Sequence, residues 1–271
     1  MSAEEPMLVI KDVVKRFSSP QGPVVAIDGM SLDVSPSEFV SVIGPSGCGK
    51  STLFNLIGGL DTATEGSITV AGEVIDGPHP AIGMVFQEES TFPWRTVIDN
   101  VAFPLEIAGV PKAERLDRAH HFVSLVGLSG FEKRYPRELS GGMRQRVAIA
   151  RTLASQPKLL LMDEPFAALD EQTRLLLGDK VLQIQQELKQ TIVLITHNIT
   201  EAVQLSDRVL VMTYRPGRTK RIVEIDLPRP RSSEIVGTER FAHYVAEIWS
   251  DLREEASRGM REAEAASRMP R

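Results

Sequence analysis

The stretch from Glu38 to Ile57, EFVSVIGPSGCGKSTLFNLI, is the most informative part of the sequence because it joins three patterns. Residues 38–43 are rich in Val and Ile and predict a strand, while residues 51–57 predict a helix. Between them, Gly44–Ser51 matches the pattern G-x-x-x-x-G-K-[ST]. Its glycines permit a tight turn that points backbone N–H groups at a polyphosphate, and the helix start adds its positive end. The stretch therefore predicts a phosphate-binding loop.

Side chains within this loop have predicted roles of their own. Lys50 is expected to reach the outer phosphates, and the Ser51 hydroxyl is expected to ligate Mg²⁺. Cys48 is the one cysteine of the chain, which excludes an intrachain disulfide and a cysteine-based metal cluster. It is either a small packing residue or a regulatory thiol. The residues predicted to contact the nucleotide here are Gly44, Pro45, Ser46, Gly47, Cys48, Gly49, Lys50, Ser51 and Thr52.

A pair of acids follows a second strand. Residues 158–163 are almost wholly apolar, as in a central strand that is covered on both faces; the run ends at Asp163, and Glu164 follows it. Open α/β sheets bind ligands at the carboxyl ends of their strands. We predict that Asp163 holds Mg²⁺ and that Glu164 polarises the attacking water, since phosphoryl transfer needs mainly positioning and charge neutralisation.

Strand and helix signals alternate along the rest of the chain. Short strands are predicted at residues 67–70, 82–86, 191–196 and 208–213, and helical segments dominate from Val97 to about Ala154. This alternation predicts an α/β fold with a mostly parallel sheet flanked by helices, and a helical subdomain inserted at about residues 90–155. We expect one domain over residues 1–230, followed by a C-terminal helix and a flexible tail over residues 231–271.

The C-terminal region combines an apolar helix face with a charged end. Its apolar side chains recur at helical spacing, which predicts that this face packs on the body of the protein. They are Phe241, Val245, Ile248, Trp249 and Leu252. The segment from Glu254 to Arg271 is rich in Ala and in charges of both signs, and we expect it to be frayed or disordered.

Composition narrows the range of partners. The chain has 271 residues, a net charge of −5 and a pI near 5.7, which argues against nucleic acid as the main partner. No apolar stretch approaches the roughly 18 residues that a membrane-spanning helix needs, and the acidic start lacks the form of a signal peptide. A role at a membrane would therefore depend on docking to an embedded partner.

The string Leu139-Ser140-Gly141-Gly142-Met143 gives the chain a close resemblance to ABC-type ATPase subunits. The family pattern is LSGGQ, and here Met143 takes its fifth position. The matching motifs run in the family's order and cover roughly residues 8–215. They are the phosphate loop, Gln87, LSGGM, Asp163-Glu164, Ala168-Leu169-Asp170 and His197. The resemblance implies the ABC ATPase fold: a P-loop core with a mostly parallel sheet, a small antiparallel β subdomain and an inserted helical subdomain.

The resemblance also implies an ATP site shared between two copies. Ser140, Gly141, Gly142 and Met143 would face the γ-phosphate held by a second copy, so that two chains pair head to tail around two ATP molecules. The start of the helix after Ser140 suits this role because helix starts attract anions. Asp170 would lie at the seam between the copies.

Three more residues take roles from the resemblance. Gln87 would contact Mg²⁺ and the attacking water and sense the membrane partner. His197 would contact the γ-phosphate. Phe17 occupies the position of an aromatic residue that stacks on adenine, although simple packing is an alternative. The catalytic set is then Glu164, His197, Gln87 and Lys50, and the Mg²⁺ ligands are Ser51, Gln87 and Asp163.

Several strings resemble the nitrate, sulfonate and taurine group of bacterial importer ATPases. They are Phe92-Pro93-Trp94 with Val97–Val101, the stretch 163–170, and Arg215-Pro216-Gly217-Arg218. The group implies an ATPase on the cytoplasmic face of the cell membrane, bound to permease subunits and served indirectly by a solute-binding protein. The alternatives are the ATPase of an exporter or lipid-extraction complex, and a nucleotide-sensing adaptor.

Two segments have competing interpretations. Phe92, Pro93 and Trp94 either line a groove that receives a permease helix or form a buried hinge between subdomains. Residues 215–231, with six basic and two acidic side chains, predict a solvated hairpin or, alternatively, a lipid-binding patch.

Overall fold

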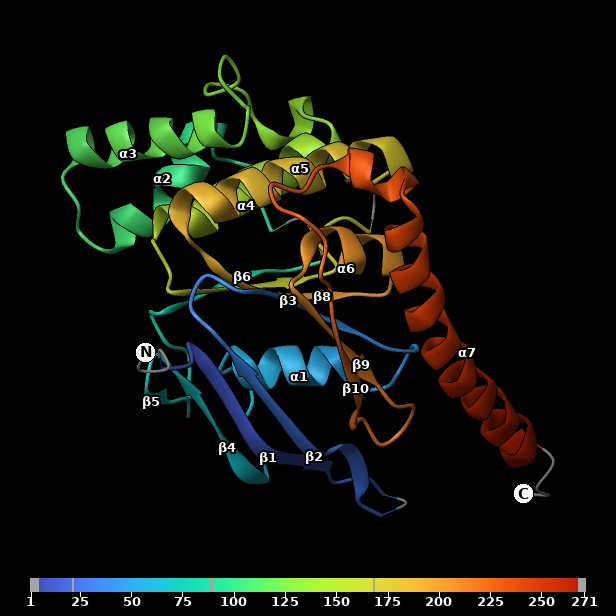
Figure 1. Cartoon of the computed structure of the whole chain (residues 1–271). Helices are drawn as coiled ribbons and strands as arrows, with labels where there is room; N and C mark the ends of the chain where they lie inside the picture. Colours follow the sequence, from blue (N-terminus) through green and yellow to red (C-terminus); the bar gives the residue numbers. More distant parts are fainter. Residues whose placement is uncertain (1–4, 21, 88–89, 168, 268–271) are drawn as a thin grey trace.

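A computed structural model describes residues 5–20, 22–87, 90–167 and 169–267, and it contains two sheets (Figure 1). The larger sheet has six strands in the order β10-β9-β3-β8-β7-β6. β9, β3, β8, β7 and β6 run parallel, and β10 is antiparallel to β9. These strands are β3 (Phe39–Ile43), β6 (Ile82–Val85), β7 (Leu159–Asp163), β8 (Thr191–Thr196), β9 (Arg208–Met212) and β10 (Thr219–Glu224). The predicted parallel sheet is confirmed.

A four-stranded antiparallel sheet in the order β2-β1-β4-β5 faces the larger one. Its strands are β1 (Leu8–Phe17), β2 (Val24–Val34), β4 (Glu65–Val70) and β5 (Glu73–Val74). Helix α1 (Lys50–Ile57) lies between the two sheets (Figure 1) and buries Leu53 and Phe54 in a core shared with both. The resemblance implied such a sheet, although the residue pattern had not located β1 and β2.

Helices cover the other face of the larger sheet. α2 (Val97–Ile107), α3 (Lys112–Leu125), a 3-10 turn (Pro136–Glu138) and α4 (Gly141–Ala154) are inserted between β6 and β7, where helices were predicted. α5 (Glu171–Leu188) joins β7 to β8. Apolar side chains from all four helices meet Phe39, Leu160 and Ile192 of the sheet in one core.

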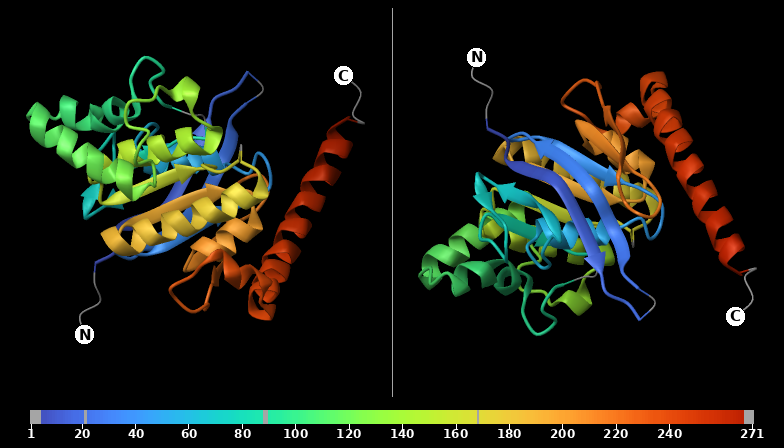
Figure 2. Two further views of the ribbon diagram at one scale, coloured as in Figure 1. Left: turned by 90° about the horizontal axis from the view of Figure 1, so that it is seen from above. Right: turned by 90° about the horizontal axis from the view of Figure 1, so that it is seen from below.

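The C-terminal region is more ordered than expected. α6 (Ile199–Leu205) and a 3-10 turn (Ser233–Gly237) precede α7 (Glu239–Ser267), which runs along one side of the molecule (Figure 2). Phe241, Ile248 and Leu252 of α7 are buried against β9, as predicted, whereas Trp249 is 58% exposed. The expectation of a frayed tail is wrong from Glu254 to Ser267, which is helical, and residues 268–271 lie outside the described residues.

Among the described helices, none is both long and apolar enough to cross a membrane.

Candidate functional site

The predicted catalytic residues follow neighbouring parallel strands. The phosphate loop follows β3, His197 follows β8, Asp163 ends β7 with Glu164 directly after it, and Gln87 follows β6. These four strands are adjacent in the sheet in the order β3-β8-β7-β6. Because they are parallel, their carboxyl ends meet at one edge, which is where open α/β sheets bind ligands.

The phosphate loop needs glycine where the backbone turns. Gly47 and Gly49 have φ angles of 76° and 104°, in the left-handed region. A Cβ atom on Gly49 would also lie 2.9 Å from the carbonyl oxygen of Ala26 in β2. Lys50 is 8% exposed, and its Nζ atom donates hydrogen bonds to the carbonyls of Gly44 at 2.7 Å and Pro45 at 3.1 Å. Carbonyl groups of the phosphate loop thus fix the Lys50 ammonium group at the start of α1.

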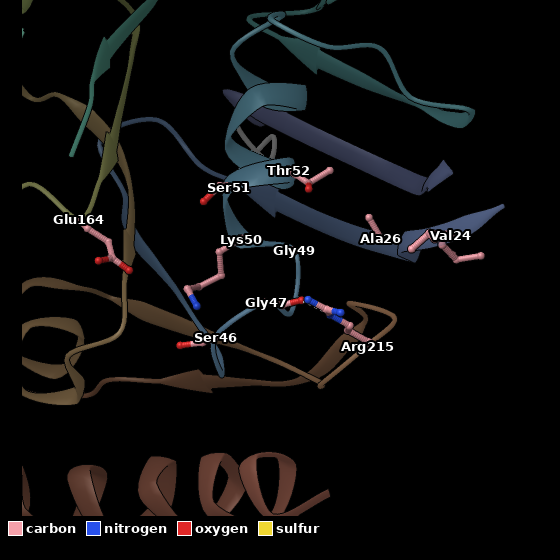
Figure 3. A pocket seen from close by; sticks show the side chains of 11 residues that line it. Val24, Ala26, Ser46, Gly47, Gly49, Lys50, Ser51, Thr52, Glu164 and Arg215 are labelled. Carbon is pink, nitrogen blue, oxygen red and sulfur yellow. Dashed lines mark hydrogen bonds between the residues drawn. The ribbon is translucent and has the colours of Figure 1, made fainter. Parts of the chain in front are cut away.

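An open cavity of about 450 Å³ lies over this loop (Figure 3). Its volume is in the usual range for small-molecule sites. Glu164 lies at one end of the cavity and Val24, Ala26 and Arg215 lie at the other, with Lys50 between them. The lining residues are Val24, Val25, Ala26, Ser46, Gly47, Gly49, Lys50, Ser51, Thr52, Glu164 and Arg215. An ammonium group, three hydroxyls and a helix N-terminus suit a polyphosphate.

The two acids at the end of β7 have different surroundings. Burial raises the pKa of Asp163 to about 6, and the neighbouring carboxylate of Glu164 adds to this shift, while Lys50 opposes it. Glu164 has an unusual backbone φ angle of 44°, and its N–H donates to the carbonyl of Ile195 at 2.8 Å. Its Oε2 atom lies 3.0 Å from Nδ1 of His197. The structure thus joins Glu164 and His197 directly.

The residues predicted to bind a metal fit Mg²⁺ by their chemistry. Ser51, Gln87 and Asp163 offer a hydroxyl, an amide and a carboxylate oxygen, the donor type that Mg²⁺ prefers. The positive charge of Lys50 acts on Asp163, which places this carboxylate beside the phosphate loop. Within the described residues, no group of three His, Cys, Asp or Glu side chains is arranged to hold a metal. The remaining ligands would therefore be water and phosphate oxygens.

A buried network of hydrogen bonds and an ion pair lies next to His197 and was not predicted from the sequence. Thr196 Oγ1 donates to Glu201 Oε2 at 2.6 Å and accepts from the N–H of Asn198 at 3.0 Å. Glu201 also pairs with Arg174 at 3.2 Å. Burial raises the pKa of Glu201, and these hydrogen-bond and charge contacts partly offset it. The network fixes the backbone on both sides of His197. An acid in the first turn of α6 was the only local signal for it.

Part of the LSGGM motif lines a second cavity of about 520 Å³. Ser140 Oγ caps α4 by accepting from the N–H of Met143 at 3.3 Å. Ser140, Gly142 and Met143 line this cavity, and Gly141 begins α4. Among the described residues, no phosphate-loop residue lines it. One chain therefore does not bring LSGGM together with its own phosphate loop.

Asp170 caps a neighbouring helix. Its Oδ1 accepts from the N–H of Thr173 at 3.0 Å, and its Oδ2 accepts from the Thr173 hydroxyl at 2.7 Å. These hydrogen bonds lower the pKa of Asp170. Thr173 also lines the second cavity. Ala168, predicted as part of the same motif, lies outside the described residues.

Two predicted nucleotide contacts differ in their surroundings. Phe17 is 41% exposed, pairs with Val24 across β1 and β2, and has Lys15 Nζ 5.0 Å from its ring centre, but it does not line the cavity itself. Cys48 is fully buried with its sulfur 4.0 Å from that of Met212, and burial raises its thiol pKa. This environment favours packing over a regulatory thiol.

The structure bears on the two segments that had competing interpretations, residues 92–94 and 215–231. Trp94 is 73% exposed, so it is not part of a buried hinge. In residues 215–231, five basic side chains pair with acids and the sixth, Arg215, contacts a backbone carbonyl, which favours a hairpin over a lipid-binding patch. The five are Arg218, Lys220, Arg221, Arg229 and Arg231.

Comparisons with known proteins agree with this geometry. A family model described as ABC transporter matches residues 27–167. An uncharacterized ABC transporter ATP-binding protein of Methanocaldococcus jannaschii, MJ0412, is 49% identical over 254 residues, 94% of either chain. The nitrate import ATP-binding protein NrtD of a Synechocystis species is 47% identical, covering 91% of this chain and 95% of its own.

A solved structure resembles the fold. The dimeric ATP-binding cassette MJ0796, in a post-hydrolysis state bound to ADP and Pi, superposes with a TM-score of 0.71 and 32% identity. The match covers 82% of this chain and all of MJ0796. Motifs, fold and relatives thus agree, and this chain belongs to the ABC transporter family as an ATP-binding protein with ABC-type ATPase activity.

Proposed function

We propose that the chain is the nucleotide-binding subunit of an importer, and that it works as a homodimer at the cytoplasmic face of the inner membrane. It would power a permease that takes up nitrate, a sulfonate, taurine or a similar small solute delivered by a solute-binding protein. The likeness to a nitrate import ATP-binding protein over 91% of this chain supports this class of solute.

The main support for a dimer is that the phosphate loop and the LSGGM motif line two separate cavities of one chain. The phosphate loop and Glu164 line one, and Ser140 and Met143 line the other. Head-to-tail pairing would place the LSGGM motif of each copy over the phosphate loop of its partner. Each nucleotide would then be enclosed by two chains. The dimeric state of MJ0796 bound to ADP and Pi supports this arrangement.

Residues of the first cavity, together with Gln87, Asp163 and His197, would supply the parts of phosphoryl transfer. Lys50, Ser51 and the N–H groups of the loop would hold the phosphates. Mg²⁺, held by Ser51, Gln87 and Asp163, would neutralise phosphate charge. Glu164 would accept a proton from water as the water oxygen bonds to the γ-phosphorus and the bond to the β-phosphate oxygen breaks. His197, 3.0 Å from Glu164, would orient its carboxylate and contact the γ-phosphate.

The dimer is tested by two substitutions at Ser140 in a Glu164→Gln background, which is expected to bind ATP without turning it over. Asp and Asn both cap helices well, so Ser140→Asp and Ser140→Asn should both preserve α4. Only Asp places a negative charge against the partner's γ-phosphate. We expect ATP to produce dimers of Glu164→Gln and of its Ser140→Asn form, measured by size-exclusion chromatography with light scattering.

The Ser140→Asp form should stay monomeric while it still binds ATP. Equal dimerisation of the Asp and Asn forms would contradict the shared site. A chain that encloses ATP fully as a monomer would contradict it as well.

A further inference from the structure

The loop between β9 and β10, residues 213–218, lies against the phosphate loop. The N–H of Gly217 donates to the carbonyl of Ala26 at 2.9 Å, and the N–H of Asp28 donates to the carbonyl of Gly217 at 3.0 Å. The loop is thus hydrogen-bonded to β2 beside the cavity. It holds the string Arg215-Pro216-Gly217-Arg218, to which the proposed ATPase chemistry gives no role.

Two glycines bring the loops into direct contact. A Cβ atom on Gly217 would lie 2.3 Å from the carbonyl oxygen of Cys48, so only glycine fits there. A Cβ atom on Gly47 would lie 2.7 Å from a terminal guanidinium nitrogen of Arg215. These close contacts fix the backbone position of Arg215 and the point at which its side chain crosses the phosphate loop.

The Arg215 side chain is hydrogen-bonded to the phosphate loop and lines the cavity. Its Nε atom donates to the carbonyl of Gly47 at 2.9 Å, across 168 positions of sequence. Among the described residues it forms no ion pair, whereas Arg218 pairs with Asp28. Figure 3 shows Arg215 with Val24 and Ala26 at the end of the cavity away from Glu164.

This end of the cavity would hold the nucleoside. Lys50, Ser51 and Glu164 set the direction of the phosphate chain, so the ribose and base extend toward Val24, Ala26 and Arg215. A guanidinium group is planar, always charged and weakly hydrated, and it stacks on aromatic faces. The Nε atom of Arg215 is anchored to Gly47 and a terminal nitrogen packs against the same glycine, so the guanidinium would meet a ligand with its opposite face.

We propose that Arg215 is a nucleotide-binding residue that contacts the ribose and base of the adenine nucleotide. This rests on the proposed placement of the phosphates at Lys50. Arg215 then forms one side of a nucleoside subsite whose other side is the hairpin of β1 and β2. It acts in binding and positioning, and it is not a group that reacts.

The test compares a ligand that contains the nucleoside with one that lacks it. We would measure the Kd of ADP and of inorganic tripolyphosphate by calorimetry at physiological salt for the whole chain. The variants are Arg215→Ala, Arg215→Lys and the matched control Arg218→Ala, which removes the same charge from the same loop but outside the cavity. Thermal denaturation without ligand checks that all variants fold alike.

We expect Arg215→Ala to raise the Kd of ADP about tenfold, Arg215→Lys about threefold and Arg218→Ala less than twofold. For tripolyphosphate, Arg215→Ala and Arg218→Ala should agree within about twofold. Unchanged ADP binding by Arg215→Ala would overturn the proposal. So would an equal loss of ADP and tripolyphosphate, since Arg215 would then be a phosphate ligand or a brace for the loop.

The Lys50→Ala variant shows whether a negative result means that the role of Arg215 is wrong or that the proposed phosphate site is wrong. It should weaken both ADP and tripolyphosphate more than tenfold. If Lys50→Ala changes neither, the placement of the phosphates is wrong and the nucleoside subsite is overturned with it. If Lys50→Ala behaves as expected and Arg215→Ala does not, only the role of Arg215 is wrong.

Discussion

Glu164 is held in place by its backbone as well as by its side chain. Its φ angle of 44° is uncommon for a residue with a Cβ atom, and it persists because the N–H of Glu164 bonds to Ile195 and the N–H of Ala167 bonds to Glu164. This turn directs the carboxylate back over the cavity, where Nδ1 of His197 meets it. Local strain of this kind is typical of functional sites.

Glu164→Gln should therefore remove catalysis while it preserves binding. The amide cannot accept a proton, so we expect ATP turnover to fall by about 10²–10⁴-fold. ATP affinity should stay within about threefold, because Lys50 and the loop N–H groups are unchanged. Phosphate release and equilibrium binding measure the two effects. Glu187→Gln, an exposed acid on α5, is the matched control. A near-normal rate in Glu164→Gln would refute the assigned role.

At the scale of the element, α7 is fixed along its length by contacts with the β9–β10 region. Glu255 accepts from the N–H of Tyr214 at 2.9 Å and pairs with Lys220 at 2.9 Å. Four residues later, a Cβ atom on Gly259 would lie 2.7 Å from the ring of Tyr214, so glycine permits close packing there. These contacts explain why the helix continues past Leu252.

Glu255→Gln should destabilise the protein in a pH-dependent way. Burial would raise the pKa of Glu255, but the Tyr214 N–H and Lys220 outweigh it, so the pKa is lowered. A lowered pKa contributes stability above the unfolded pKa of about 4.3, and this contribution is lost as pH falls below that value. Loss of the charged hydrogen bond should cost about 1–2 kcal/mol, or roughly 2–6 °C in Tm at pH 7.

The difference in Tm between wild type and Glu255→Gln should stay constant from about pH 8 to 5.5 and shrink toward pH 4. Thermal denaturation followed by circular dichroism measures it. Glu262→Gln, which breaks the exposed pair with Arg258 on the same helix, should change Tm by about 1 °C at most. A difference that does not depend on pH would show that Glu255 acts by shape rather than charge.

At the scale of the molecule, different parts of the fold form the two cavities and the exposed surface around Trp94. The edge of the larger sheet forms the cavity over the phosphate loop, and the helical layer carries the LSGGM cavity. The segment before α2 presents Trp94, which is 73% exposed. The Phe92 ring packs against both Trp94 and Phe103, with ring centres 5.6 Å and 4.7 Å apart. An exposed aromatic side chain that packs on other aromatic rings is typical of an interface anchor.

Trp94→Ala should impair coupling to the permease without impairing the ATPase site. We expect the isolated chain to keep normal ATP binding, while co-purification with the permease and solute uptake by vesicles fall at least fivefold. Trp249→Ala removes another exposed indole, on α7, and should leave assembly intact. Normal assembly and full transport by Trp94→Ala would reject the docking role.

Features that depend on near neighbours in the chain were predictable. The phosphate loop, the acids at the end of β7 and the mostly apolar, buried strands β3, β7 and β8 can each be recognised within about ten residues, because backbone turns and two-sided burial constrain local composition. β1 and β2 were missed because register shifts interrupt their pairing and blur the alternation that marks a half-buried strand.

No local sequence pattern indicates the contacts between segments that are distant in the chain. Arg215 meets Gly47 across 168 positions, Glu255 meets Tyr214 across 41, and the separation of LSGGM from the phosphate loop depends on how the helical layer sits on the sheet. The chemistry of a motif is written in neighbouring residues because a few torsion angles set its geometry. Which surfaces meet depends on packing over the whole chain, and no short stretch of sequence contains that information.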